Sequence, residues 1–171
     1  MSKASNSGFV KIKRALISVS DKSELKKLAE TLAKLKVEII STGGTYRQLK
    51  EWGVKTQAVS SYTAYPEILG GRVKTIHPKI FGGILALRED SKQQKEIKAK
   101  KIKLLDLVVV NLYPFEETLK KGGVTQSGIL EQIDIGGPSL IRAAAKNFQA
   151  VAVLTNPNQY SEIREELQQN Q

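Results

Sequence analysis

One nine-residue stretch holds several of the chain's most reactive side-chain types. Residues 70–78 read Gly-Gly-Arg-Val-Lys-Thr-Ile-His-Pro and include Arg72, Lys74 and the only histidine, His77. Adjacent glycines let a ligand approach backbone N–H groups, while Arg offers a planar fork of donors and Lys a compact charge. The combination favours a site for a phosphate or a delocalised polar ring. A surface turn with solvated cations has the same pattern, so the choice depends on the rest of the chain.

Two further stretches have the composition of an anion-binding turn. Ser20-Asp21-Lys22 follows the apolar run 14–19, and Thr42-Gly43-Gly44-Thr45 follows the run 37–41. Both precede segments with apolar residues at helical spacing, which predicts strand, turn and helix twice over. Turns after parallel strands meet at one edge of a sheet, where helix N-termini bind anions. Either turn alone is explained by ordinary helix capping, but together they favour phosphate.

Polar residues also occur near the end of the apolar run 104–112, which is typical of a central strand covered on both faces. That run contains Val110 and Asn111 and leads to Tyr113. A capping Asn and a Tyr at the rim of the protein would explain these residues without a ligand. If the protein binds a ligand, the side chains of Asn111 and Tyr113 would lie at the same edge of the sheet as the two turns.

The stretch 134–138, Asp-Ile-Gly-Gly-Pro, opens another helical pattern. Pro138 suits the first turn of a helix, and Arg142 and Lys146 share the face opposite the apolar residues. Without a ligand, Asp134 would be a favourable charge at a helix start and Lys146 a solvated residue. With a ligand, Asp134 would lie at a glycine-lined helix start.

The alternation of apolar runs and helical patterns predicts an α/β fold, with a parallel sheet covered by helices on both faces. The segment 80–87, with a second glycine pair, is compatible with helix or strand. Asp21 and Glu24 have the spacing of a capping box. Strands are expected at 14–19, 37–41, 54–59, 104–112 and 151–154; helices are expected over 25–35, 46–52, 90–101, 125–132, 138–148 and 160–167.

Composition sets further bounds. With 171 residues we expect one domain, and the absence of cysteine excludes disulfides and thiolate metal ligands. No apolar run approaches the ~20 residues of a membrane span, and the N-terminus lacks the apolar region of a secretory signal, so a cytoplasmic protein is expected. A net charge of +10 invites nucleic-acid binding, but the lysines are scattered and the densest run, 92–103, has no interleaved aromatic residues. We therefore expect neither nucleic acid nor membrane as partner.

From about Arg14 to its end, the chain resembles the IMP cyclohydrolase domain, the N-terminal part of the bifunctional purine biosynthesis enzyme that also carries AICAR transformylase. The motifs ISVSDK, STGGT, GGRVKTIHP, NLYPF and QIDIGGPSLIRAAAKN occur in the family's order. The resemblance implies a three-layer methylglyoxal-synthase-like fold over 14–171, after a flexible basic arm at 1–13, and a homodimer. It implies no metal or organic cofactor. The transformylase domain is absent from this chain, and whether the chain is a piece or a stand-alone enzyme stays open.

The resemblance also implies roles for individual residues. Four positions match residues regarded as catalytic, with Lys146 the usual proton donor and acceptor: Lys74, Tyr113, Asp134 and Lys146. Those that match contacts to the nucleotide and its phosphate are Ser20, Asp21, Lys22, Thr42, Gly43, Gly44, Thr45, Arg72, Val73, Thr75, Val110, Asn111, Ile135 and Gly136. For His77 we expect a structural hydrogen bond before Pro78 instead of a catalytic role.

The reaction implied is ring closure of 5-formamidoimidazole-4-carboxamide ribotide to inosine monophosphate (IMP), with loss of water. We expect Asp134 to orient the carboxamide, Lys146 to carry the proton, and Lys74 and Tyr113 to polarise the formyl group. Two alternatives of the same fold stay open: a methylglyoxal-synthase-like lyase, and a regulatory module that binds a nucleotide without converting it.

Overall fold

The computed structural model describes residues 10–112, 115, 120 and 123–170. Its sheet has five strands in the order β3-β2-β1-β4-β5, and every neighbouring pair is parallel. The parallel α/β fold expected from the sequence is confirmed. The strands are β1 (Arg14–Val19), β2 (Glu38–Ser41), β3 (Thr56–Ala58), β4 (Leu107–Asn111) and β5 (Ala152–Leu154).

The two central strands are apolar on both sides because both faces of the sheet are buried. Along β4, Leu107 and Val109 point into one core cluster, while Val108 and Val110 point into the other. This alternation is the two-residue period of a strand, and all four side chains are almost fully buried. A run that is apolar at successive positions is therefore what such a strand requires.

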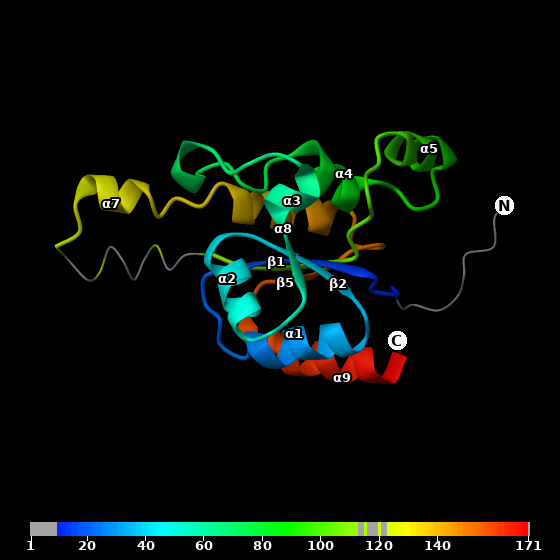
Figure 1. Cartoon of the computed structure of the whole chain (residues 1–171), viewed down its shortest axis with the longest axis horizontal. Coiled ribbons are helices and arrows are strands. Elements are labelled where there is room, and N and C mark those ends of the chain that lie inside the picture. Colours follow the sequence, from blue (N-terminus) through cyan, green and yellow to red (C-terminus); the bar gives the residue numbers. More distant parts are fainter. Residues whose placement is uncertain (1–9, 113–114, 116–119, 121–122, 171) are drawn as a thin grey trace.

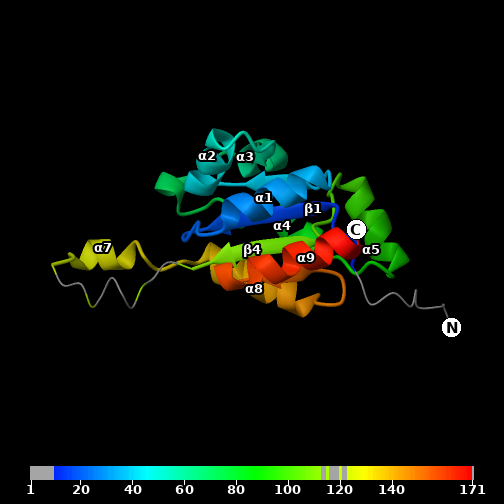
Figure 2. The same ribbon diagram turned by 90° about the horizontal axis from the view of Figure 1, so that it is seen from below.

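Helices cover both faces of the sheet, as Figure 1 shows with the sheet nearly edge-on. One face is packed by α1 (Leu25–Lys34), α2 (Gly43–Glu51) and α9 (Tyr160–Asn170), and α1 and α9 lie side by side in both views (Figures 1 and 2). The other face is packed by α3 (Val59–Thr63), α4 (Pro78–Leu85) and α8 (Gly136–Lys146). Helix α5 (Ser91–Ala99) lies at one end of the molecule, and α7 (Gln126–Leu130) extends away from the sheet at the other. Two short 3-10 helices are η1 (Leu69–Gly71) and η2 (Pro157–Gln159).

Several helix boundaries differ from the sequence expectations. Helix α2 starts at Gly43, earlier than the expected Tyr46, because the two glycines join its first turn. The capping box expected for α1 does not form: Glu24 is left-handed (φ 57°) and makes no capping bond. The carboxylate of Asp21 instead accepts the N–H of Ser23. Residues 80–87, left open between helix and strand, belong largely to α4.

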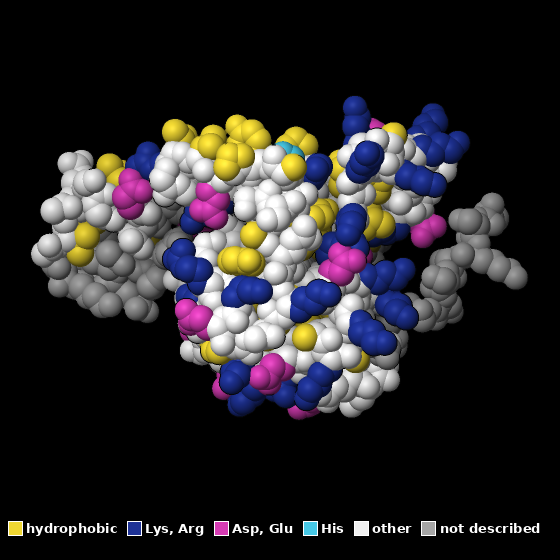
Figure 3. All heavy atoms as spheres, in the orientation of Figure 1, with side chains coloured by type: hydrophobic (Ala, Val, Ile, Leu, Met, Phe, Trp, Pro, Cys, Tyr) yellow, Lys and Arg dark blue, Asp and Glu magenta, His cyan; other side chains and the backbone are white. Residues whose placement is uncertain are grey.

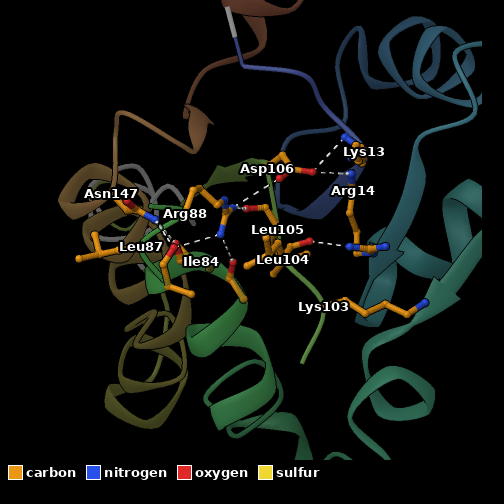
Figure 4. Close-up of polar contacts among 12 residues, drawn as sticks. Lys13, Arg14, Ile84, Leu87, Arg88, Lys103, Leu104, Leu105, Asp106 and Asn147 are labelled. Atoms are coloured by element: carbon orange, nitrogen blue, oxygen red, sulfur yellow. Dashed lines mark hydrogen bonds and ion pairs between the residues drawn. The ribbon is translucent and has the colours of Figure 1, made fainter. Parts of the chain in front are cut away.

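A buried polar network joins the strands at their amino ends (Figure 4). Asp106 Oδ2 accepts the N–H groups of Lys13 and Arg14 at 2.9 and 3.0 Å. The Arg88 guanidinium donates to Asp106 Oδ1 and to the carbonyl of Leu105. Nearby, the buried Asn147 donates to the Ile84 and Ala86 carbonyls and so links the end of α8 to the end of α4. This network fixes the edge of the sheet opposite the site described below.

Contacts with the core begin inside the arm expected at residues 1–13. Ile12 belongs to a core cluster, and the N–H of Lys13 is held by Asp106. Within the described residues, no helix has the length and apolar character needed to cross a membrane. Figure 3 shows Lys and Arg side chains spread over the visible face, with a group over α5.

Candidate functional site

A cleft of about 710 Å³ opens at the carboxyl edge of the sheet. Its volume is in the range of small-molecule sites, roughly 300–1,000 Å³. It lies beside the carboxyl ends of β1, β2 and β4; ligands bind in this place in open parallel sheets, at the point where strand order reverses. The residues lining it are Ser18, Val19, Ser20, Lys22, Thr42, Gly43, Gly44, Thr45, Gly70, Gly71, Arg72, Lys74, Thr75, Ile76, Asn111, Leu130, Glu131, Ile133, Asp134, Ile135, Gly136 and Gly137.

The start of α2 supplies backbone N–H groups to this cleft. Thr42 is its extended N-cap, and the first N–H groups of any α-helix have no partner within the helix. The hydroxyl of Thr45 is not available to a ligand in this arrangement, because it donates to the carbonyl of Val19 and accepts its N–H. An anion at this turn would therefore be bound mainly by backbone amides and by the positive end of the helix.

The Ser20–Lys22 turn is held by Asn111 at the end of β4. Asn111 Oδ1 accepts the N–H groups of Ser20 and Asp21 at 2.7 and 2.9 Å, and its Nδ2 donates to the Asp21 carbonyl at 2.8 Å. The Asn111 side chain thus fixes the turn between β1 and α1. Lys22 Nζ donates to the carbonyl of Ser20, and both residues line the cleft. Hydrogen bonding from Ser23 lowers the pKa of Asp21, which does not line the cleft.

The central glycine stretch folds into a tight hairpin on the cleft wall. Ile68 and Val73 pair in an antiparallel bridge, and Leu69, Gly70 and Gly71 between them all have positive φ. Lys74, directly after the bridge, turns back over the glycines: a Cβ added at Gly71 would lie 2.7 Å from Lys74 Cε. A Cβ added at Gly43 would lie 3.4 Å from Lys74 Nζ. The ammonium therefore lies between the hairpin and the start of α2.

Arg72 forms an ion pair with Glu131, contributed by the segment after α7. Hydrogen bonding between the two lowers the pKa of Glu131 and raises that of Arg72. Both side chains are more than half exposed, so solvent screens this pair and an anionic ligand can compete for Arg72.

Asp134 lies on the cleft at the start of α8. Its Oδ1 accepts the N–H of Gly137 at 2.7 Å, which orients the carboxylate. Neither glycine here has room for a side chain: a Cβ at Gly137 would lie 2.5 Å from Asp134 Oδ2, and one at Gly136 would lie 2.8 Å from Thr75 Oγ1. The glycine pair lets Asp134 and the loop carrying Thr75 approach the helix closely.

Not every residue implied by the resemblance reaches the cleft. Lys146 is exposed in the last turn of α8, ten residues after Gly136, which places it about 15 Å along the axis from the helix start. Val110 is buried in the core, and Val73 lines a second, smaller pocket instead of the cleft. Tyr113 lies outside the described residues.

His77 has the structural role expected for it. It is the N-cap of α4, where its Nδ1 accepts the N–H of Lys79 at 3.1 Å, just before Pro78. Burial and the nearby Lys79 ammonium lower the pKa of His77, which favours the neutral, accepting form.

Several lining residues were not among the expected site residues. Gly70 and Gly71 belong to the nine-residue stretch, and Gly137 adjoins Gly136, so their neighbours signal their position. No local pattern marks Glu131, because only the folded chain brings it to Arg72. Among the described residues, no group of three His, Cys, Asp or Glu side chains is placed to hold a metal ion.

Comparison with known proteins identifies the family of the chain. The MGS-like domain family matches residues 24–139. The bifunctional purine biosynthesis protein PurH of Synechocystis sp. is 57% identical over 156 residues, which cover 91% of this chain and 30% of that protein. PurH of Listeria monocytogenes is 51% identical over 159 residues, covering 93% and 31%. The chain therefore spans about 30% of the length of these curated relatives.

A solved structure, the crystal structure of ForH, superimposes with a TM-score of 0.80 at 36% sequence identity. The match covers 91% of this chain and 78% of that one. The chain belongs to the MGS-like domain family and corresponds to the MGS-like part of the bifunctional purine biosynthesis proteins.

Proposed function

We propose that this chain is an IMP cyclohydrolase, which closes the second ring of 5-formamidoimidazole-4-carboxamide ribotide to give IMP and water. The observation that carries the proposal is a single cleft lined by an amide-rich anion turn, a lysine and a carboxylate: Gly43–Thr45, Lys74 and Asp134. A ribotide needs an anion site for its phosphate and groups in the same cleft that can transfer protons. The similarity to PurH proteins supports this choice of substrate.

In the proposed reaction the substrate supplies its own nucleophile. The carboxamide nitrogen attacks the formyl carbon and loses a proton, while the formyl oxygen gains one and becomes a hydroxyl. Loss of a second N–H proton and departure of the hydroxyl as water then form the C=N bond. Holding the two groups in contact lowers much of the barrier, since an intramolecular reaction needs orientation above all.

Two described side chains have suitable positions for the proton steps. Lys74 can stabilise the developing oxyanion with its ammonium and then protonate it. Asp134 can accept the carboxamide proton, because its hydrogen bond to the Gly137 N–H orients one oxygen and leaves the other as an acceptor. The roles of Tyr113 and Lys146 stay predictions; Lys146 in particular has no contact with the cleft of a single chain.

The test follows the absorbance change of the formylated ribotide as the ring closes. We expect wild type to turn over and the Lys74→Met and Asp134→Asn variants each to lose about 100-fold or more in kcat. Lys95→Met, an exposed lysine on α5, is the matched control and should keep the wild-type rate. Lys146→Met belongs in the same series, where a normal rate would exclude it from the chemistry.

Outcomes of this series separate the alternatives. A protein that binds IMP but turns over no ribotide would be the regulatory module. Release of inorganic phosphate from dihydroxyacetone phosphate would indicate the lyase. The homodimer implied by the resemblance is a further prediction, which sedimentation equilibrium of this chain checks directly.

A further inference from the structure

The hairpin of residues 68–73 sets a carboxylate opposite the lysine of the cleft. Its bridge has two hydrogen bonds, Ile68 N to Val73 O at 3.2 Å and Val73 N to Ile68 O at 3.4 Å. Glu67 and Lys74 are the next residues outward on the two arms. Residues directly opposite each other on an antiparallel pair extend from the same face, so the backbone itself brings Glu67 and Lys74 together.

Side-chain positions agree with this register. A Cβ placed on Gly71 would lie 3.2 Å from Lys74 Nζ and 3.5 Å from Glu67 Oε2. Both charged groups therefore approach the same point over the turn. Gly71 has φ +90°, a conformation that residues with side chains rarely adopt, and its bare backbone leaves this space open.

The second oxygen of Glu67 connects the hairpin to the anion turn. Glu67 Oε1 accepts the hydroxyl of Thr42 at 2.8 Å, and Thr42 is only 7% exposed at the N-cap of α2. Lys74 Nζ also reaches this turn, 3.4 Å from the position of a Cβ on Gly43. The Glu67 carboxylate thus bonds to the start of α2 and approaches the same point over Gly71 as the Lys74 ammonium, but the two are too far apart to form a direct ion pair.

We propose that Glu67 is a positioning residue that holds the Lys74 ammonium over Gly43 and Gly71 while it fixes Thr42. A lysine side chain has a flexible four-carbon stem and loses much conformational freedom when it is confined. A nearby counter-charge favours the rotamers that place its ammonium over the two glycines. The kinetic consequence rests on the cyclohydrolase function proposed above. The placement of Lys74 does not, and it is tested separately.

The kinetic test compares Glu67→Gln and Glu67→Ala with Glu89→Gln, an exposed glutamate outside the cleft. Gln keeps an acceptor for Thr42 but loses the charge, whereas Ala loses both. We expect kcat to fall about 10-fold in Glu67→Gln and about 100-fold in Glu67→Ala, with KM changed less than about 3-fold, because misplacing a reacting group acts on the chemical step. Glu89→Gln should match wild type. Unchanged kcat in Glu67→Ala would overturn the proposal.

A double-mutant cycle shows whether Glu67 acts through Lys74. In a Lys74→Met background, Glu67→Gln should cost less than about 2-fold in kcat, since the group that it positions is already absent. A further loss as large as in the wild-type background would mean that Glu67 acts elsewhere, and would also overturn the proposal.

A third measurement needs no turnover. In protein with ¹³C-labelled lysine and glycine, wild type should show a nuclear Overhauser contact between the Lys74 ε-protons and the Gly71 α-protons. The contact should persist in Glu89→Gln and weaken at least about 3-fold in Glu67→Ala, because a released side chain samples several rotamers. If wild type converts no ribotide, the proposed function fails while this contact still decides the role of Glu67. A contact that is unchanged in Glu67→Ala refutes it.

Discussion

Replacing Gly44 by Ala should separate folding from binding. Gly44 lies in the first turn of α2 and lines the cleft, and an added Cβ would have its nearest protein neighbour 4.0 Å away, at a guanidinium nitrogen of Arg47. The backbone does not have positive φ there, so Ala fits without strain. Ala also restricts the unfolded chain, and we expect a stability change between zero and a gain of about 0.5–1 kcal/mol.

The same methyl group would hinder an anion at this turn. It stands on the amide-rich surface of Gly43–Thr45, where a phosphate must come within hydrogen-bonding distance of the backbone. Losing one hydrogen bond to a charged group costs about 1.5–3 kcal/mol. Since each 1.4 kcal/mol is tenfold in affinity, IMP should bind about 10- to 100-fold more weakly.

Two measurements on the same samples check this pair of effects. Urea unfolding followed by circular dichroism gives the free energy of unfolding, and isothermal titration with IMP gives Kd. Gly53→Ala is the matched control: its φ is +72° with nothing within 4 Å, and Gly53 does not line the cleft. It should lose about 1 kcal/mol of stability through backbone strain and keep its affinity for IMP. Unchanged IMP affinity in Gly44→Ala would refute the anion site; a stability loss above about 1 kcal/mol would refute the free space at Gly44.

Two other substitutions test the supports of the site. Asn111→Ala removes three hydrogen bonds to the Ser20–Asp21 turn, so urea unfolding should show a loss of about 2–3 kcal/mol at about 1 kcal/mol per bond, and IMP affinity should also fall. Asn158 is exposed, so Asn158→Ala should change neither the stability nor the IMP affinity. An Asn111→Ala protein as stable as wild type would show that Asn111 does not hold the turn between β1 and α1. For His77 the folded pKa is lowered from 6.5, so the unfolded chain takes up the proton first and stability falls as pH drops through and below 6.5. Asn can still cap α4, so the His77→Asn variant should unfold at about the same urea concentration as wild type at about pH 7.5. At about pH 5.5 the variant should lose less stability than wild type does. An identical pH dependence of stability in the two proteins would refute the lowered pKa of His77.

The sequence predicted the sheet well because its strands depend on local composition. The runs at 14–19 and 104–112 are largely apolar at successive positions, as expected for a strand buried on both faces. Glycine and hydroxyl residues after the strands then indicated which turns would meet. Helix ends were less predictable, since Gly43 and Gly44 count against a helix by propensity yet form the first turn of α2.

What sequence reasoning missed were partners distant in the chain. Nothing local tells that Thr45 and Asn111 use their polar groups on backbone atoms of β1 and the turn after it. Lys146 lies far from the cleft because it is in the last turn of α8, whereas the catalytic role expected for it came from the resemblance alone. Glu67 became visible only when the hairpin register was known.

The polar network at the amino ends of the strands has a practical consequence for protein engineering. Asp106, Arg88 and Asn147 make their bonds at the edge of the sheet away from the cleft. The bonds from Lys13 to Asp106, from Arg88 to Leu105 and from Asn147 to Ile84 join segments distant in sequence. Random libraries screened for a new substrate should leave positions 83–88 and 104–106 untouched, because changes there would remove folded protein from the screen without reshaping the binding surface. Diversity is better placed at exposed lining positions such as Ile133 and Ile135, where a new side chain meets the ligand first.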